Sequence, residues 1–174
     1  SREHTNGLVA ERLKQSEFSG DLWKLNQEDV LAGAMSEPVA ISESELRKPD
    51  DGAGFARRIP VREERASGWR TRSVDDFTEA LLNLTVLVLD APVCDTIDEM
   101  EAMVTFLFKR QRLPRMWKRD IKRAYRNLGA RASELQHMSV VWRDGGVIWR
   151  STHFALPFGT TGAVYGWHRF ANIY

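Results

Sequence analysis

The stretch MSVVWRDGGVIWRSTHFAL, residues 138–156, carries the strongest local fold signal in this chain of 174 residues. Asp144-Gly145 is a dipeptide that favours the tight turn of a two-stranded hairpin. Valine and tryptophan residues alternate with other residues on both sides of this turn, as they do in strands that bury one face. The stretch therefore predicts a β-hairpin, which the following PFGTTG motif (157–162) ends.

Outward from this hairpin, the apolar patterns predict a mixture of strands and helices. Further strands are predicted at 55–63, 69–77, 84–92 and 116–121. Helical spacing of apolar residues predicts helices at 7–18, 23–35, 95–112 and from 163 onward. This order indicates an α+β fold.

Residues 36–54 are rich in Ser, Glu, Pro, Asp and Gly, a composition typical of a loop or linker. We therefore predict that residues 1–56 form a helical N-terminal appendage with its linker. Residues 57–174 would then form the main domain.

Composition excludes several classes of protein. No apolar run approaches the roughly 20 residues that span a bilayer, and no secretory signal opens the chain. Cys94 is the only cysteine, so an internal disulfide and a cysteine zinc site are excluded. We expect an intracellular protein, cytoplasmic or nuclear, without a membrane partner.

Positive charge is concentrated in residues 109–131, which contain ten Lys or Arg residues and a single acid, Asp120. Such a block attracts polyanions, nucleic acid above all. A solvated helical face is the simpler explanation of a basic run by itself, but the single acid inside this one makes it less ordinary. Asp120 itself could hold Mg²⁺, a cation that takes oxygen ligands, or could pair with Arg119 or Arg123.

Three other groups of residues have competing interpretations. Arg70 and Arg72 share one face of a predicted strand, where they could bind phosphate or protect an exposed sheet edge. Asp75 and Asp76 could bind a metal as paired acids, but alternation favours one pointing inward and the other outward. The four histidines, His4, His137, His153 and His168, lack any metal-ligand spacing, so we expect packed or surface histidines.

Three blocks taken in order resemble one family. They are RTRSVDDFTEALLN (70–83), RDIKRAYRNL (119–128) and HFALPFGTTGAVYGWHRF (153–170). Together they resemble the fingers and the first half of the palm of a reverse transcriptase, the RNA-directed DNA polymerase of retroelements. The resemblance covers residues 57–174 and implies part of a right-hand polymerase fold.

The resemblance implies roles for matching positions. Asp120 and the Ile121 carbonyl would hold Mg²⁺, and Arg72 would contact the triphosphate of the incoming nucleotide. Tyr125 would lie under the sugar, and Phe158 with Gly159 would shape the nucleotide pocket. The implied partners are dNTPs and an RNA or DNA template-primer, contacted by the basic residues of the second block: Lys118, Arg119, Lys122, Arg123 and Arg126.

The family's second catalytic block, Tyr-x-Asp-Asp, is absent from these residues. One carboxylate cannot build a two-metal centre, so we expect the chain alone to be an inactive fragment of this retrotransposon nucleotidyltransferase. Two alternatives are a non-enzymatic nucleic-acid-binding module and a non-functional relic that folds poorly.

Overall fold

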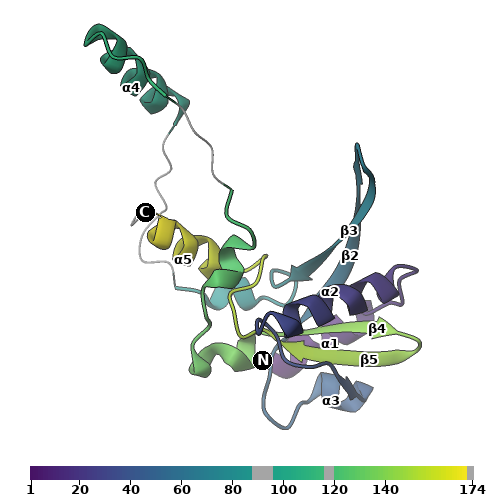
Figure 1. The fold of residues 1–174 in the computed structure, drawn as a ribbon. Helices are drawn as coiled ribbons and strands as arrows, with labels where there is room; N and C mark the ends of the chain where they lie inside the picture. Colours follow the sequence, from purple (N-terminus) through teal and green to yellow (C-terminus); the bar gives the residue numbers. More distant parts are fainter. Residues whose placement is uncertain (88–95, 116–119, 172–174) are drawn as a thin grey trace.

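The computed structural model describes residues 1–87, 96–115 and 120–171. Within these residues the chain forms a five-stranded sheet (Figure 1). Its strands lie in the order β1 (Val39–Ile41), β5 (Val147–Thr152), β4 (Ser139–Asp144), β2 (Phe55–Arg65) and β3 (Gly68–Asp76). Neighbouring strands are antiparallel except β2 and β4, which run parallel. The mixed sheet and its helices confirm the predicted α+β class.

The predicted hairpin is formed by β4 (Ser139–Asp144) and β5 (Val147–Thr152). Gly145 and Gly146 make the turn with φ values of 57° and 80°, a left-handed backbone that glycine adopts without a steric penalty. Trp142 lies opposite Trp149 in the register, and Trp23 packs edge-on against both. These aromatic contacts fix the helix α2 (Ser19–Leu31), which contains Trp23, on this face of the sheet.

The second hairpin consists of β2 (Phe55–Arg65) and β3 (Gly68–Asp76), as predicted from their apolar patterns. β2 also pairs with β4, but only over Phe55, Ala56 and Arg57. Pro60 lies beyond this paired part, where its missing N–H leaves no gap in the β2–β4 ladder. The outer half of the hairpin projects from the body (Figure 1).

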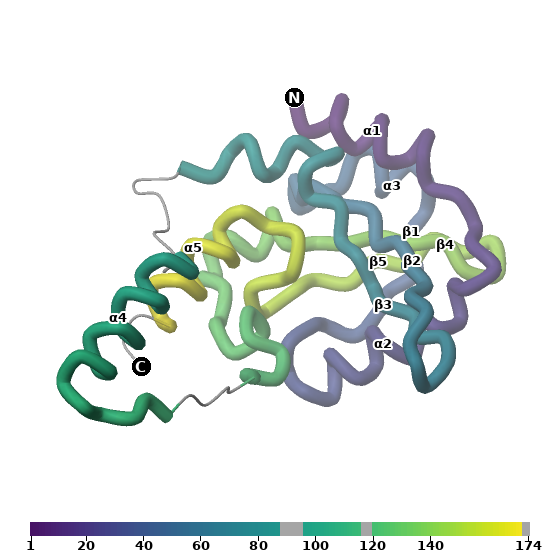
Figure 2. Tube along the Cα trace, turned by 90° about the horizontal axis from the view of Figure 1, so that it is seen from above, coloured from purple at the N-terminus to yellow at the C-terminus, as the bar shows by residue number. Residues whose placement is uncertain are grey.

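The N-terminal residues, which were predicted to form a helical appendage, pack on both faces of the sheet. α1 (Arg2–Arg12) and α3 (Glu43–Arg47) cover one face, and α2 (Ser19–Leu31) covers the other (Figure 2). Val9 and Leu46 belong to the same buried cluster as Phe55 and Val141. The predicted boundary at residue 56 therefore does not coincide with a break in the packing.

Residues 36–54 also contain regular structure, so the prediction of a simple linker is wrong there. β1 (Val39–Ile41) pairs with β5 at the edge of the sheet. Ser42 caps α3, and Ser42 and Glu45 form a reciprocal capping box. The strand was not predicted because its partner lies more than 100 residues away in the sequence.

Two other strand predictions fail where the structure can test them. Leu82–Thr85 forms the 3₁₀ helix η1, held by a hydrogen bond of 2.7 Å from the Thr85 hydroxyl to the Leu82 carbonyl. Asp120 and Ile121 are not in a strand, and the 3₁₀ helices η2 (Ala124–Asn127) and η3 (Ala132–His137) follow. The rest of the two predicted strands, 88–92 and 116–119, lies outside the described residues.

The two predicted C-terminal helices are confirmed as α4 (Ile97–Lys109) and α5 (Thr161–Ala171). Thr96 caps α4 in a capping box with Glu99. Among the helices that the structure describes, none has the length and apolar character needed to cross a membrane.

Candidate functional site

A group of ionised and polar side chains is buried between α2 and the sheet. Arg58 of β2 lies opposite Asp75 of β3, and His153 follows the end of β5. The side chains of Arg58, Asp75 and His153 are only 0%, 2% and 0% exposed. Because buried charge is costly unless paired, the contacts of these groups decide whether this region is stable.

Arg58 is surrounded by oxygen acceptors. Its Nη2 donates to Asp29 Oδ2 at 3.2 Å and to Ser73 Oγ at 2.9 Å. Its Nη1 donates to Asn26 Oδ1 at 3.3 Å, and its Nε lies 3.6 Å from Asp75 Oδ1. One guanidinium thus joins α2, β2 and β3.

The contacts of His153 define its tautomer. Its Nε2 lies 2.9 Å from Asp75 Oδ2, and its Nδ1 is hydrogen-bonded to Arg126 Nη1. Arginine can only donate, so Nδ1 accepts and Nε2 carries the proton that is donated to Asp75. Arg126 Nη2 also pairs with Asp29 at 3.1 Å, and Asp29 pairs in turn with Arg58.

The pKa values follow from burial and from these partners. Burial alone would raise the pKa of Asp75, but Arg58 and His153 outweigh it and lower this pKa to about 2. Burial lowers the pKa of His153 to about 4, although Asp75 opposes the shift. Near neutral pH, Asp75 is therefore ionised and His153 is neutral.

We call this set the buried network: Asn26, Asp29, Arg58, Ser73, Asp75, Arg126 and His153. Both ring nitrogens of His153 are occupied, so neither can take a proton from a nucleophile. The arrangement suits a structural role, because it holds α2, β2, β3, η2 and the end of β5 together.

The loop that contains residues 156–159 (LPFG), within the third block, packs against this network. Gly159 has a φ of 96°, and a Cβ added to it would overlap the backbone oxygen of Asp75. Asn83 donates from Nδ2 to the Gly159 carbonyl and accepts from the Thr161 N–H, both at 2.9 Å. The chain passes this close to β3 only because residue 159 is a glycine.

An aromatic group lies beside the loop. The Tyr125 ring is in edge contact with Phe158 at a centroid distance of 4.7 Å and with Trp167 at 6.3 Å. Phe158 remains half exposed. The structure thus brings together Tyr125 and Phe158, two residues predicted to shape one nucleotide pocket.

Arg72 is not part of this group. It lies midway along the β2–β3 hairpin, opposite Val61 in the register, and its Nε pairs with Glu63 at 3.0 Å. The tip of this hairpin points away from α5 (Figure 1). Among the ring contacts of the described residues, Tyr125 meets Phe158 and Trp167 but not Arg72.

The basic residues predicted to contact nucleic acid divide into two groups. Lys122 is exposed. Arg123 pairs with Glu28 at 3.3 Å, and the Arg126 side chain is only 8% exposed within the buried network. Lys118 and Arg119 lie outside the described residues. Of the described positions, Lys122 is the one available to a polyanion without breaking an ion pair in the structure.

The predicted metal ligands lie at the surface. Asp120 and Ile121 are both exposed, and no ion pair among the described residues joins Asp120 to Arg123. In the described part of the chain, no three His, Cys, Asp or Glu residues are grouped to hold a metal ion. These residues do not fit a two-metal centre.

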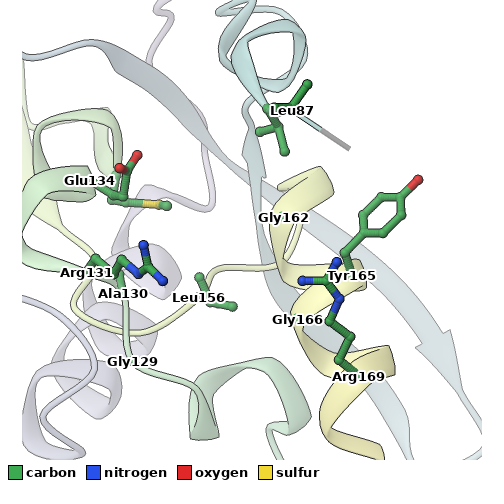
Figure 3. Close-up of a pocket in the computed structure, with 12 residues that line it drawn as sticks. Leu87, Gly129, Ala130, Arg131, Glu134, Leu156, Gly162, Tyr165, Gly166 and Arg169 are labelled. Atoms are coloured by element: carbon green, nitrogen blue, oxygen red, sulfur yellow. The ribbon is translucent and has the colours of Figure 1, made fainter. Parts of the chain in front are cut away.

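A pocket of about 370 Å³ opens beside α5. Arg131 and Glu134 form one wall, and Tyr165, Gly166 and Arg169 of α5 form the opposite wall (Figure 3). None of the residues predicted to bind nucleotide or metal lines this pocket.

No protein family and no curated protein matches this chain. The physical arrangement of the residues therefore carries the functional argument.

Part of the buried network was accessible to sequence reasoning. Alternation predicts that one of Asp75 and Asp76 is inside, and Asp75 is buried. The packed alternative for His153 is also correct. Asn26, Asp29 and Arg58 were missed, although the adjacent pair Arg57-Arg58 in a strand implies that one arginine faces inward.

Proposed function

We propose that residues 57–174 are the fingers and first half of the palm of a retroelement reverse transcriptase. Their function would be to engage an RNA or DNA template-primer and dNTPs. Mg²⁺ would serve the complete enzyme, in which it stabilises charge during phosphoryl transfer.

The supporting observation is the convergence of three sequence blocks that are far apart in the chain. Asp75 of the first block lies under Gly159 of the third, and Tyr125 of the second contacts Phe158 of the third. His153 joins the first and second blocks through Asp75 and Arg126. A polymerase requires such convergence, because its nucleotide pocket is assembled from separate segments.

A two-metal centre requires carboxylates in addition to Asp120, and among the described residues no three His, Cys, Asp or Glu side chains are grouped to hold a metal ion. We therefore expect these 174 residues to bind nucleic acid without extending a primer. Primer extension by this chain that is lost in Asp120→Asn would contradict this expectation.

Binding is tested by fluorescence anisotropy with a labelled RNA–DNA template-primer at increasing KCl. We expect affinity to fall steeply with salt, and Lys122→Glu to weaken binding and reduce the salt slope by about 1. Lys14→Glu, at an exposed position between α1 and α2, is the matched control. Equal effects of the two substitutions would argue against an interface at Lys122.

A second candidate, the non-enzymatic nucleic-acid-binding module, is favoured by the exposed Asp120, which belongs to no metal-binding group of side chains in the described part of the chain. The two proposals differ at the aromatic group. A polymerase part should prefer a recessed primer end over a blunt duplex of equal length, and Tyr125→Ala should remove this preference. Trp69→Ala, at an aromatic residue exposed elsewhere, is the control. A module would bind both duplexes alike.

A further inference from the structure

Helix α4 presents an apolar face that nothing in the described structure covers. Ile97, Met100, Met103 and Phe108 are 81%, 49%, 62% and 55% exposed. The helix stands apart from the sheet (Figure 1), and none of its residues is buried. An apolar surface of this kind on a soluble helix marks an interaction site.

The helix has its own stabilising features, so this face is presented in a fixed geometry. The Thr96 hydroxyl accepts from the Glu99 N–H at 3.3 Å, and Glu99 accepts in return from the Thr96 N–H at 2.6 Å. Four apolar positions repeat at helical spacing along one stripe: Ile97, Met100, Val104 and Leu107. Such a stripe is what a second helix packs against.

The charges beside this stripe indicate the partner. Glu99 and Arg110 are eleven residues apart, close to three turns, so they lie along the same edge of the stripe at opposite ends. The N-terminal turn also carries Asp98, and the C-terminal turn carries Lys109. An antiparallel copy of α4 would place Glu99 of each chain opposite Arg110 of the other.

We propose that α4 is a homodimerisation helix that pairs antiparallel with α4 of a second chain. The two-fold axis would pass near Val104, so that the apolar stripes meet and both Glu99–Arg110 pairs form at once. A parallel arrangement would place acids against acids and bases against bases, so the charge pattern selects the antiparallel one.

The size of the helix limits the strength of the dimer. Thirteen residues span about 20 Å, and two such helices bury less than the roughly 1,200–2,000 Å² typical of stable complexes. We therefore expect a reversible dimer with a dissociation constant in the micromolar range.

The test is sedimentation equilibrium of the full chain from micromolar to sub-millimolar concentration. The wild type should dimerise, and Arg110→Glu and Glu99→Arg should each weaken self-association about tenfold or more, since two-fold symmetry counts every substitution twice. An equimolar mixture of the two variants should form heterodimers again. Circular dichroism of each variant checks that α4 remains helical.

Two further variants separate charge from folding. Glu99→Gln keeps an N3 residue that supports the capping box but loses the charge, so it should weaken the dimer less than Glu99→Arg. Met100→Lys should abolish dimerisation without affecting the fold, because Met100 lies in the stripe and is 49% exposed. A wild type that stays monomeric throughout, or charge variants that self-associate like the wild type, would overturn the proposal.

Discussion

Gly159 combines two constraints that separate variants can distinguish. Its φ of 96° is unfavourable for any residue with a Cβ, and its Cβ position overlaps the Asp75 oxygen. Gly33 has a similar φ of 69° but open space around it. We expect Gly159→Ala to lower the free energy of unfolding by roughly 2 kcal/mol or more, and Gly33→Ala by about 1 kcal/mol. Urea unfolding of both variants measures the difference, and equal losses would mean that the overlap relaxes freely.

At His153 the prediction concerns pH. The folded-state pKa of about 4 lies below the ordinary value of 6.5, so the unfolded chain binds more protons between these values. Stability is therefore complete above pH 6.5 and is lost as pH falls toward 4, by roughly 2–3 kcal/mol. Urea unfolding between pH 7 and 4.5 measures this loss.

The control for this prediction is His137, the other histidine with a lowered pKa, which is shifted first by burial and then by Arg2. His153→Gln should remove most of the loss between pH 7 and 4.5, whereas His137→Gln should leave most of it. Asp75 does not contribute in this window, since its pKa shift from 3.8 to about 2 acts only at lower pH. An unchanged pH profile in His153→Gln would show that other groups titrate.

At the scale of elements, two capping boxes of the same type lie in different surroundings. Ser42 caps α3, which carries the fully buried Leu46, whereas Thr96 caps the exposed α4. Ser42→Ala should lower the global free energy of unfolding by about 1 kcal/mol. Thr96→Ala should reduce helix content but leave the urea midpoint of the core unchanged. Hydrogen exchange and urea unfolding together check both outcomes.

The same contrast explains which elements the sequence predicts. The β4–β5 hairpin and α4 depend on local signals, a turn dipeptide and a cap, and both were predicted within a few residues. β1 depends on β5, and the buried network depends on Asp29, Arg58 and Arg126 meeting from distant segments. The residue pattern of a short stretch of sequence carries no information on contacts between distant segments, so these contacts could not be predicted. For the same reason, only the resemblance indicated that Tyr125 and Phe158 lie close together.

At the scale of the whole molecule, the relic alternative predicts broad, non-cooperative melting. The buried network argues for a sharp transition, because losing one segment leaves buried charges of the others unpaired. Calorimetric and van't Hoff enthalpies that agree would exclude the relic. A van't Hoff value well below the calorimetric one would favour it.

The N-terminal residues give the strictest test of this interdependence. A chain of residues 57–174 would lack Asn26 and Asp29, so Arg58 and Arg126 would share the single carboxylate of Asp75. It would also lack Val9 and Leu46 of the core cluster. We expect this shortened chain to show no cooperative urea transition and no near-ultraviolet circular dichroism. Adding residues 1–56 as a separate peptide should restore both, because the missing groups return without a covalent link. A shortened chain that unfolds sharply by itself would instead make residue 56 a true domain boundary.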